Sequence, residues 1–570
     1  MTTQKKILIT SALPYANGPL HFGHLAGAYL PADVITRHRK MEGHKVIHIS
    51  GSDEHGVAIM LNAQKVKRPY KEYVNDWHKS HKELFDRYEV AFDFFGQTSA
   101  DYHYEEVVKW FKELHAKGFI GTKDEQQLYC NDCKNFLPDR FVQGTCYICG
   151  YAHARGDECP ECGTWIEPNK LKNPVCQICG GKDHIEIKTS TQYYLLLSKY
   201  HKEFRQWFES KKGEWRNTVW PYVDSLSKEG LHDRAISRDL DWGIDVPLPE
   251  AKGKKLYVWF DAPIGYVSNT KKLMEQNGNK EDYLKDWWQN KDVELVHFIG
   301  KDNIIFHTII FPVMSMASGC AKPATDVPAN QYLNLAGKQF SKSQGWYVDA
   351  EKAMTLLGPD ALRYYLISII PENADSSFTW EGFQAKVNGE LANNIGNLVA
   401  RCLKFWAKNW PEGMETKYFA DFVKSVECQK LSEGIKEHVE LLDKVEIRKG
   451  LDRVMALGQV VNTFFSDRAP WAQVKVDREA AAKTIAETSM QILVLGVLLA
   501  PYLPTLSRKL LSHFENVTEE RKTRIYAGDL SVLNEIFGAG MKLQGTPDIL
   551  VPKIEDKLIA ELQAELEGKK

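Results

Sequence analysis

Hydrophobic positions in the first 118 residues alternate between short runs and longer helical patterns. Ile7–Thr10 and Lys45–Ile49 are short, β-like apolar runs. Between them, Leu25–Met41 follows the pattern of a helix, which Pro31 interrupts and should kink. Strands that alternate with helices predict a parallel sheet with helices on both faces and a ligand crevice at the strand ends.

A long segment interrupts this alternation. Residues 119–235 hold closely spaced cysteines, followed by an aromatic stretch of mixed charge. Beyond it, the apolar runs Leu256–Phe260 and Leu295–Gly300 predict two further strands. We therefore expect an α/β sheet in two halves, residues 1–118 and 236–331, separated by an insertion.

The pattern becomes helical in the last third of the chain. A connective module is expected over residues 332–390, a helical domain over 391–550 and an acidic, amphipathic tail over 551–570. Apolar residues recur at spacings of three and four in Leu391–Trp406, Ile447–Phe465 and Thr484–Leu499. This periodicity predicts a helical bundle.

Length and composition narrow the class of protein. With 570 residues the chain is too long for one core, and we expect two to four domains. Its 43% hydrophobic and 26% charged residues are typical of soluble globular proteins, and its net charge of −2 indicates no global field for nucleic acid. The longest apolar run, Ile492–Ala500, is too short to span a bilayer, and no signal-peptide pattern begins the chain. We expect a cytoplasmic protein without a membrane partner.

Cysteine spacing predicts metal binding. Eight of the eleven cysteines form four C-x-x-C pairs, Cys130/Cys133, Cys146/Cys149, Cys159/Cys162 and Cys176/Cys179. In a reducing compartment such pairs favour zinc knuckles over disulfides, with a redox dithiol or an iron–sulfur cluster as alternatives. Four pairs supply ligands for two Cys₄ sites. Spacing leaves open whether the pairs combine in nested or sequential order.

The turn after the first predicted strand is a candidate for phosphate chemistry. It is rich in proline and glycine and places His21 and His24 at the opening of a helix, three residues apart, so both rings can lie on one side. Gly23 leaves room for a ligand near the backbone. The first turn of a helix offers unpaired N–H groups and a partial positive charge, which suit phosphate. The alternative is a turn with two exposed imidazoles.

A second candidate lies more than three hundred residues further on. Gly337–Gly345 is a polar loop bounded by glycines, with one lysine between two serines. Such a loop can close over a polyphosphate and withdraw, although a plain surface loop has the same composition. Together the two segments resemble the H-x-G-H and F/M-S-K-S signatures of class I aminoacyl-tRNA synthetases. Gln339 stands where many members have a first lysine, and Lys338 could substitute for it.

Four more stretches resemble methionyl-tRNA synthetases, and the resemblance runs through nearly the whole chain. They are Gly51–Gly56, Ser237–Gly243, Val258–Ser268, and Phe298–Asn303 with His307. The resemblance implies a methionine pocket lined by Ala12, Leu13, Tyr15, Trp259, Ala262, Pro263, Tyr266 and His307, with Asp53 holding the substrate ammonium. An unbranched thioether suits such an aromatic environment, because sulfur packs well beside aromatic rings.

The same resemblance assigns the remaining site residues. It implies catalytic roles for His21, His24 and Lys342, and ATP contacts from these residues and from Gly23, Gly300, Asp302, Ser341 and Ser343, with Mg²⁺ on the phosphates. It favours Cys146, Cys149, Cys159 and Cys162 as one zinc site and leaves Cys130, Cys133, Cys176 and Cys179 as a second.

The helical region contains a candidate for RNA recognition. Asn397 and Arg401 are four residues apart, on one helix face, and Trp471 follows Pro470. Unpaired bases are recognised by stacking and by hydrogen bonds to their edges. The alternative is the more common one, because an Asn/Arg helix pair is usually a solvated face and Pro-Trp often closes a hydrophobic seam. The resemblance implies that these four residues read the CAU anticodon. Some relatives continue into a C-terminal tRNA-binding β-barrel, and we expect that domain to be missing here.

We therefore expect a Rossmann-like, doubly wound parallel sheet with a zinc-knuckle insertion, then a connective module and an anticodon-binding bundle. The resemblance implies activation of L-methionine with ATP and transfer to tRNA(Met) by a monomer. The alternatives are a class I synthetase for another amino acid, a non-catalytic tRNA-binding protein derived from a synthetase, and a small adenylyltransferase.

Overall fold

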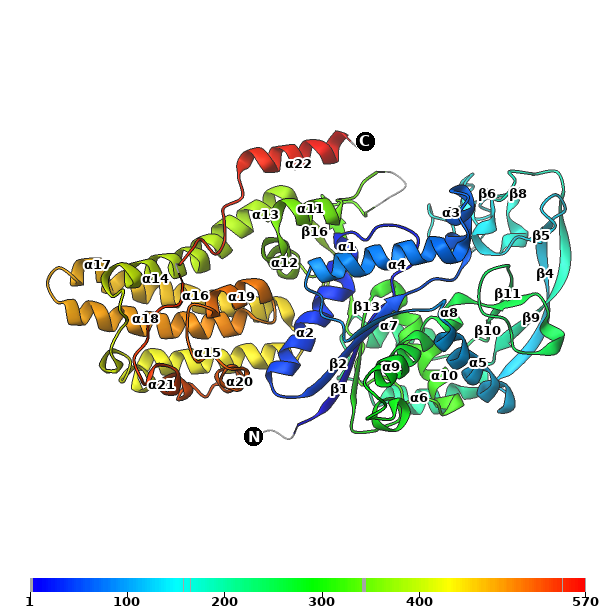
Figure 1. Ribbon diagram of the computed structural model, residues 1–570. Helices are drawn as coiled ribbons and strands as arrows, with labels where there is room; N and C mark the ends of the chain where they lie inside the picture. The colour runs from blue at the N-terminus through cyan, green and yellow to red at the C-terminus, as the bar shows by residue number, and fades with distance from the viewer. Residues whose placement is uncertain (1–3, 157, 165, 341–344, 546, 569–570) are drawn as a thin grey trace.

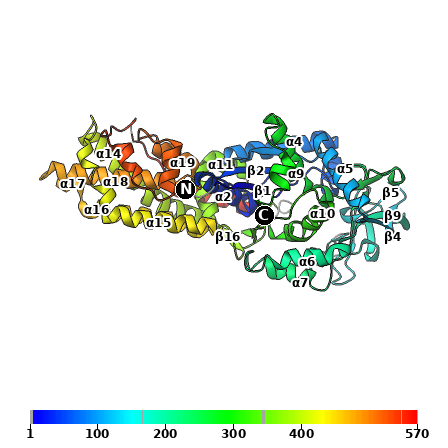
Figure 2. The ribbon, with the colours of Figure 1, turned by 90° about the horizontal axis from the view of Figure 1, so that it is seen from below.

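The chain folds into an elongated molecule, with a helical bundle at one end and the cysteine-rich insertion at the other (Figures 1 and 2). A computed structural model describes residues 4–156, 158–164, 166–340, 345–545 and 547–568. Between the two ends lies a body built on a parallel sheet, which contains the first strand of the chain.

Five parallel strands form the central sheet, in the order β14-β13-β1-β2-β3. Their bounds are β1 Lys6–Ser11, β2 Lys45–Ser52, β3 Phe94–Gln97, β13 Glu294–Gly300 and β14 Ala329–Asn330. The three strands predicted at 7–10, 45–49 and 295–300 all belong to it, and the doubly wound α/β fold is confirmed.

Successive side chains of β1 point to opposite faces of the sheet, and helices cover both faces. Ile7 and Ile9 belong to one apolar cluster and Leu8 to another, as expected when successive side chains of a strand point to opposite sides. The covering helices are α2 Leu30–Met41 and α4 Tyr70–Arg87 on one face, and α5 Asp101–Ala116, α9 Ile264–Gln276 and α10 Phe311–Ser318 on the other. The predicted interruption at Pro31 takes the form of a π-helical stretch, Leu25–Tyr29, before α2, with the proline in the first turn of α2.

The strand predicted over Leu256–Phe260 is wrong. Only β12, Lys254–Leu256, is extended, and it pairs antiparallel with β11, Ser237–Asp239, outside the central sheet. The following residues form a short helix, α8 Val258–Asp261, which leads into α9. A short apolar run fits a buried helical turn as well as a buried strand, so its hydrophobicity could not distinguish the two.

The insertion is built on a long antiparallel ribbon. β4 and β9 pair along their whole length, from Ile120 opposite Leu195 to Cys130 opposite Ile185. The remaining elements are β5 Asn135–Phe136, β6 Val142–Thr145, β7 Ala154–Arg155, β8 Lys172–Cys176, β10 Arg234–Ala235, α6 His201–Glu209 and α7 Trp220–Ser227. This ribbon brings the first and last cysteine pairs to its far end.

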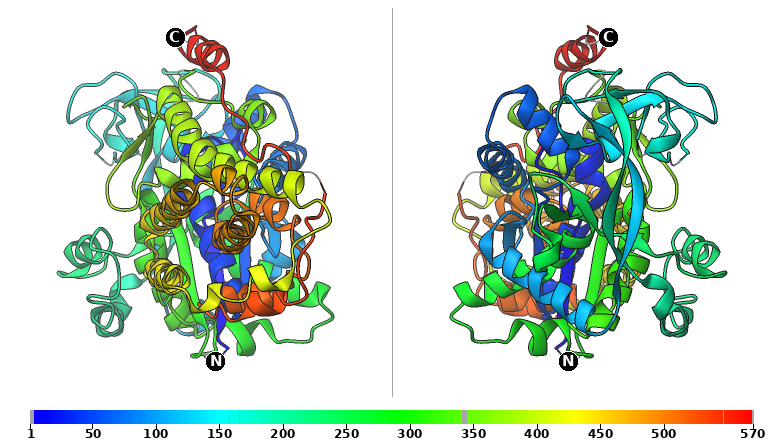
Figure 3. Two further views of the ribbon diagram at one scale, coloured as in Figure 1. Left: turned by 90° about the vertical axis from the view of Figure 1, so that its left-hand side faces the viewer. Right: turned by 90° about the vertical axis from the view of Figure 1, so that its right-hand side faces the viewer.

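The last third of the chain forms the predicted helical bundle, seen nearly end-on in the left view of Figure 3. Its main helices are α14 Asn397–Asn409, α15 Val426–Asp443, α16 Ile447–Arg468 and α18 Arg478–Leu499, extended by α17 Pro470–Gln473, α19 Pro504–Leu511, α20 Glu519–Tyr526 and α21 Val532–Phe537. Within the described chain, α18 is the one helix long and apolar enough to cross a membrane, and 94% of that apolar window is buried in the protein.

A connective module joins the bundle to the sheet. It contains the parallel pair β15 Leu333–Leu335 and β16 Ser376–Phe378, and the helices α11 Ala350–Leu357, α12 Pro359–Ser368 and α13 Trp380–Lys386. The C-terminal helix α22, Asp556–Gly568, packs against α13 (Figure 1). One continuous apolar cluster runs from Ile7 through the module to the bundle, so the two ends share a core.

Candidate functional site

The turn after β1 presents two neutral histidines. His21 caps the short helix α1, Phe22–His24, and its Nδ1 accepts a hydrogen bond from Gly23 N–H at 3.1 Å. The Nδ1 atom of His24 accepts one from His21 N–H, also at 3.1 Å. Because each Nδ1 is an acceptor, each ring carries its proton on Nε2 and is a potential donor there. The ring centroids lie 3.8 Å apart, so both imidazoles are on one side, as expected.

The structure does not leave the expected room for a ligand at Gly23. A Cβ atom there would lie 2.9 Å from Cε1 of His21 and 3.5 Å from Phe340, and the Gly23 N–H already donates to the His21 ring. The backbone of this turn is therefore covered by its own histidine, and the donors it offers outward are ring N–H groups.

The late signature reaches the histidine turn. Phe340 stacks on His21, with ring centroids 4.6 Å apart and planes inclined by 4°. Ser341, Lys342 and Ser343 lie outside the described residues. Gln339 is exposed, and the ammonium of Lys338 lies 5.8 Å from the centroid of the Trp346 ring. Two segments separated by more than three hundred residues therefore meet at one place.

Aromatic side chains gather beside this turn. Tyr15 is 41% exposed, and its hydroxyl accepts a hydrogen bond from Trp259 Nε1 at 3.2 Å. Trp259 packs against Phe306 with ring centroids 4.2 Å apart. Phe306 was not predicted as a site residue, because its packing on Trp259 depends on how α8 and the segment before α10 meet. Ala262 and Pro263 lie at the junction of α8 and α9, close to this group.

The buried end of the group is a Tyr–His pair. His307 Nδ1 lies 3.0 Å from the backbone oxygen of Asn303, which can only accept, so this nitrogen carries the proton. Burial lowers the pKa of His307 to about 4. The neutral ring therefore accepts a hydrogen bond at Nε2 from the Tyr266 hydroxyl, at 2.9 Å. The pair presents a polar but uncharged surface.

Asp53 supplies a buried carboxyl group at the end of β2. Its backbone N–H donates to Pro14 O and its carbonyl accepts from Ala16 N–H, both at 2.8 Å, which holds it beside the Ala12–Tyr15 segment. Its Oδ1 atom has no hydrogen-bond partner among the described residues. Burial, with a further contribution from Asp261, raises the pKa of Asp53 well above its usual value. A cationic ligand would satisfy this carboxyl group.

Neighbouring residues of the same motifs were missed by the sequence interpretation. His55 Nδ1 lies 2.8 Å from Asp261 Oδ2, and both side chains are buried. Trp242 Nε1 donates to the backbone oxygen of Glu54 at 2.7 Å. All four residues lie in stretches that carried the family resemblance, which was the only signal for them. Their contacts join β2, α8 and the segment after β11, so they shape the surroundings of Asp53.

Gly300 and Asp302 lie where β13 ends. The strand passes into a short 3₁₀ turn, and a Cβ at Gly300 would lie 2.6 Å from Asp302 Oδ1. Ser11, which precedes the histidine turn, pairs with Phe298 on the adjacent strand. The histidine turn and the Gly300–Asp302 turn therefore start from the carboxyl ends of the neighbouring parallel strands β1 and β13, where such folds bind ligands.

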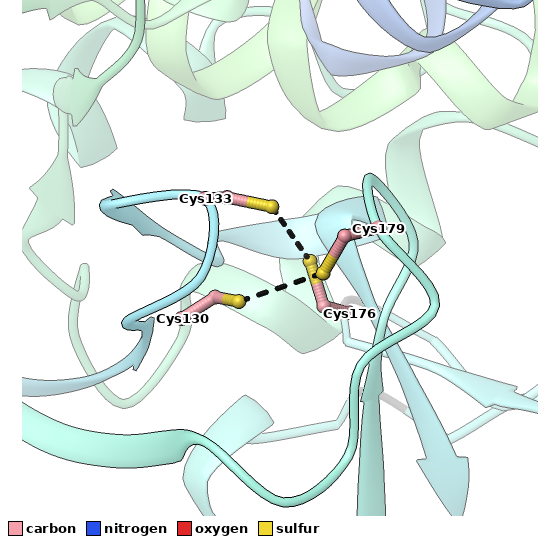
Figure 4. Close-up of side chains that lie close together, drawn as sticks. All are labelled: Cys130, Cys133, Cys176 and Cys179. Atoms are coloured by element: carbon pink, nitrogen blue, oxygen red, sulfur yellow. Dashed lines mark hydrogen bonds between the residues drawn. The ribbon is translucent and has the colours of Figure 1, made fainter.

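The cysteines form two groups of four, in nested order. Cys130 and Cys133 face Cys176 and Cys179, with Sγ–Sγ distances of 3.7 Å for 130/179 and 3.8 Å for 133/176 (Figure 4). Cys146, Cys149, Cys159 and Cys162 form the other group, with 3.6 Å between the sulfurs of 149 and 159. These distances exclude disulfides and match the roughly 3.8 Å between sulfurs around a tetrahedral ion with Zn–S bonds of about 2.3 Å. Both groups fit zinc.

The predicted RNA-reading residues converge at the far end of the bundle. The guanidinium carbon of Arg401, on α14, lies 5.1 Å from the centroid of the Trp471 ring and 5.1 Å from that of Phe465. Trp471 is 42% exposed, although Pro470 beside it is buried. Asn397 is exposed at the start of α14. Ala469, with φ of 43°, turns the chain from α16 into α17 and so presents the tryptophan.

Two family models cover most of the chain. Residues 7–403 match the model described as tRNA synthetases class I (M), and residues 423–570 match the anticodon binding domain of methionyl tRNA ligase. Because the second match extends to residue 570, the expected lack of a C-terminal tRNA-binding domain is not borne out.

Curated relatives match over nearly the whole chain. A methionine–tRNA ligase of Chloroherpeton thalassium is 37% identical over 100% of this chain and 81% of its own length. Those of Pyrococcus furiosus and Thermococcus kodakarensis are 38% and 41% identical, over 97% and 91% of this chain and 76% and 71% of their own lengths. The fold is similar to that of Mycobacterium tuberculosis methionyl-tRNA synthetase in complex with methionyl-adenylate, with a TM-score of 0.76, 22% identity, and coverage of 96% of this chain and 100% of that one.

Proposed function

The chain belongs to the methionyl-tRNA synthetase family, so its reaction is the ATP-dependent ligation of methionine to tRNA, and we propose which residues carry it out. The contact between Phe340 and His21 is the main support for the proposal. It brings the segment that leads to Lys342 to the histidine turn, where a single triphosphate can be held by both.

In the first step the methionine carboxylate attacks the α-phosphorus of ATP. A new phosphorus–oxygen bond forms as the bond to pyrophosphate breaks, giving methionyl-adenylate. The protein positions two anions and stabilises the charge that moves to pyrophosphate; orientation can supply about 7–11 kcal/mol, and one fixed donor about 10²–10³ in rate. We assign the donors to His21 and His24 through Nε2–H, and to Lys342, with Gly300, Asp302, Ser341 and Ser343 as further ATP contacts. Mg²⁺ bound with ATP would neutralise phosphate charge.

Methionine is assigned to the aromatic group beside this turn. The Asp53 carboxyl group takes the substrate ammonium, since it is buried and one of its oxygens lacks a partner among the described residues. Trp259 contacts the thioether chain, and the neutral Tyr266–His307 pair closes the far end without offering a charge. Ala12, Leu13, Tyr15, Ala262 and Pro263 complete the lining.

In the second step the terminal ribose hydroxyl of tRNA attacks the carbonyl carbon of the adenylate, and AMP leaves. We assign recognition of the CAU anticodon to Asn397, Arg401, Pro470 and Trp471. The cation–π contact between Arg401 and an exposed tryptophan supports this assignment, because aromatic and guanidinium planes are the surfaces on which unpaired bases stack.

The remaining expectations concern metals, assembly and location. Each group of four cysteines would hold one structural Zn²⁺, and the group of Cys130, Cys133, Cys176 and Cys179 would also fix the end of the β4/β9 ribbon. A cytoplasmic location accords with eleven free cysteines, because thiols stay reduced there. The monomeric state stays a prediction.

Pyrophosphate exchange with each of the twenty amino acids tests the proposed reaction. We expect ATP–pyrophosphate exchange with methionine and charging of a tRNA with a CAU anticodon. Exchange with leucine, valine or cysteine in place of methionine would contradict the substrate, and tRNA binding without exchange would favour the non-catalytic alternative.

The role of Lys342 has its own test. Lys342→Ala should lower the maximal rate of adenylate formation by about 10²–10³ and change methionine binding little, because the lysine stabilises charge that develops only in the transition state. Single-turnover adenylate formation and equilibrium methionine binding separate the two effects. Equal losses in both would remove the transition-state role.

A further inference from the structure

Arg216 lies where four parts of the molecule meet. It belongs to the insertion, between α6 and α7, and its side chain is half-buried. Nη1 donates to Oδ1 of Asn330 at 2.8 Å and to the backbone oxygen of Glu372 at 3.3 Å, while Nη2 donates to the backbone oxygen of Val445 at 3.1 Å. One guanidinium thus contacts β14 of the sheet, the connective module and the turn between α15 and α16.

On the catalytic side, a single amide continues these contacts to the histidine turn. Asn330 is buried and pairs with Gly300 in the sheet. While its Oδ1 accepts from Arg216, its Nδ2 donates to the backbone oxygen of Gly27 at 2.8 Å. Gly27 lies in the π-helical stretch that directly follows His24. A displacement of the guanidinium therefore reaches the segment that positions the histidines.

On the bundle side, Arg216 holds a strained turn. Val445 has φ of 56°, in the left-handed region where β-branched residues are rare and strain of about 1–3 kcal/mol is usual. The neighbouring Glu372 side chain accepts from Ile447 N–H at 2.7 Å and so caps the first turn of α16. The strained turn and this cap together fix where α16 begins.

Helix α16 connects this turn to the proposed anticodon site. It has 22 residues, a length of about 33 Å at 1.5 Å per residue, and ends at Arg468 just before Trp471. Its side chain Phe465 contacts both Arg401 and Trp471. A helix is rigid over this length, so a displacement at its Trp471 end is passed along α16 to the Val445 turn.

We propose that Arg216 is a positioning residue that couples the anticodon end of α16 to the turn carrying His21 and His24. The inference rests on the proposed function. When tRNA docks at Trp471, any shift of α16 must be absorbed at the Val445 turn, and Arg216 passes it through Asn330 to Gly27. The coupling acts only when bound tRNA displaces α16. Charging of tRNA therefore depends on it, whereas ATP–pyrophosphate exchange measured without tRNA does not.

Arg216→Met tests the coupling through a split between kcat and KM. It should lower kcat for tRNA charging about tenfold, within the usual range of coupling free energies, and leave KM for tRNA and the ATP–pyrophosphate exchange rate within about twofold of the parent. In a Trp471→Ala background the same substitution should have less than about a twofold further effect, because the two residues act in one chain of contacts. If the two losses multiply, or if exchange falls as far as charging, the coupling is wrong.

A second variant separates coupling from damage to the fold. Val445→Gly adopts the observed φ without strain, so in R216M/V445G the turn keeps its shape without the arginine, but the path through Asn330 to Gly27 is still missing and charging should stay as low as in R216M. Recovery of charging in R216M/V445G would show that Arg216 only holds the turn. Arg216→Lys keeps the charge, but its three donors leave from one nitrogen and cannot span acceptors on three separate elements, and it serves if R216M fails to fold. As a matched control, Arg453→Met breaks a 2.7 Å ion pair with Glu437 inside the bundle and should leave charging unchanged.

The two proposals fail differently. Absence of methionine-dependent exchange in the parent protein would overturn the proposed function, whatever the variants do. Normal exchange and charging in the parent protein, with charging recovered in R216M/V445G, would overturn the coupling alone.

Discussion

At the scale of single residues, the chemistry of the site depends on which groups are charged. His21, His24 and His307 each have a ring nitrogen whose partner fixes the tautomer, and all three rings are neutral in this arrangement. Asp53 is the exception, because its raised pKa makes ionisation depend on a cation nearby. The α-ammonium group of the substrate would provide that cation, so binding of the amino acid would itself favour the ionised form of Asp53.

Asp53→Asn should weaken methionine binding. An amide of the same shape cannot pair as strongly with an ammonium, and hydrogen bonds to charged groups contribute about 1.5–3 kcal/mol, so KM for methionine should rise about 10- to 100-fold. In the parent protein, affinity should also weaken as the pH falls, because the protonated carboxyl group loses its attraction. Exchange rates at varied methionine concentration and pH measure both effects.

Glu54→Gln is a matched control for that substitution. Glu54 is the next residue and also buried, but its Oε1 accepts from Ser52 at 2.6 Å and from Gln97 at 2.9 Å, and its Oε2 accepts from Ser99 N–H at 3.3 Å, so neither oxygen needs a ligand. Glu54→Gln should lower the unfolding temperature and leave KM for methionine unchanged. Equal increases in KM for the two variants would mean that Asp53 acts through the fold.

At the scale of elements, the anticodon site depends on three helices that meet at one point. Trp471→Ala removes the ring that lies against the Arg401 guanidinium and packs edge-to-face with Phe465. Because base stacking contributes about 1–3 kcal/mol, charging of tRNA should fall about 10- to 100-fold while ATP–pyrophosphate exchange is unchanged. Measuring tRNA charging and ATP–pyrophosphate exchange on the same preparation tests this prediction. A parallel loss of exchange would show that the tryptophan is structural.

The two groups of four cysteines make a separate prediction. Each arrangement of sulfurs suits one tetrahedral ion, so the purified protein should contain two zinc ions per chain by elemental analysis. Cys130→Ser and Cys146→Ser should each reduce that number to one, since each variant breaks a different group. A single zinc in the parent protein, or loss of both ions from one variant, would contradict two independent sites.

Much of this architecture follows from local sequence, and the exceptions have physical causes. The strands around Ile7, Lys45 and Leu295 were predicted because buried parallel strands are continuous apolar runs. Leu256–Phe260 has the same composition but becomes α8, where one helical turn buries the same side chains. Cysteine pairing could not come from spacing, because it is set by the register that places Cys130 at the end of the β4/β9 ribbon.

The site residues also divide into those that local sequence reveals and those that depend on distant contacts. The histidine turn could be recognised because its chemistry lies within a few consecutive residues. Phe306, His55 and Asp261 gave no signal of their own, since their partners come from other elements. Arg216 was missed for the same reason: all of its acceptors lie more than a hundred residues away in the chain.

At the scale of the whole molecule, catalytic body and bundle are held together by buried polar contacts as well as by their shared core. Arg363 on α12 pairs with Asp33 of α2 at 2.7 Å, with both side chains fully buried, and also donates to the backbone oxygen of Tyr502 in the bundle. Nearby, the Tyr526 hydroxyl lies 2.8 Å from Nδ1 of His38 on α2 and 3.3 Å from Nε2 of His438 on α15. The interface is therefore sensitive to protonation.

His438 should make that interface weaken in acid. Burial lowers the pKa of His438 to about 3, from an ordinary value of 6.5, and its Nδ1 contacts the backbone oxygen of Gly450 at 3.2 Å. Between these two pKa values the unfolded chain binds a proton that the folded chain does not, so this residue's contribution to the free energy of unfolding rises with pH. The slope is about 1.4 kcal/mol per pH unit below pH 6.5 and vanishes above it. His438→Gln keeps a donor and an acceptor but does not titrate. Urea denaturation of both proteins between pH 5 and 7.5 should show the parent losing stability relative to the variant as the pH falls below 6.5, and parallel curves across that range would contradict a neutral His438 in the folded protein.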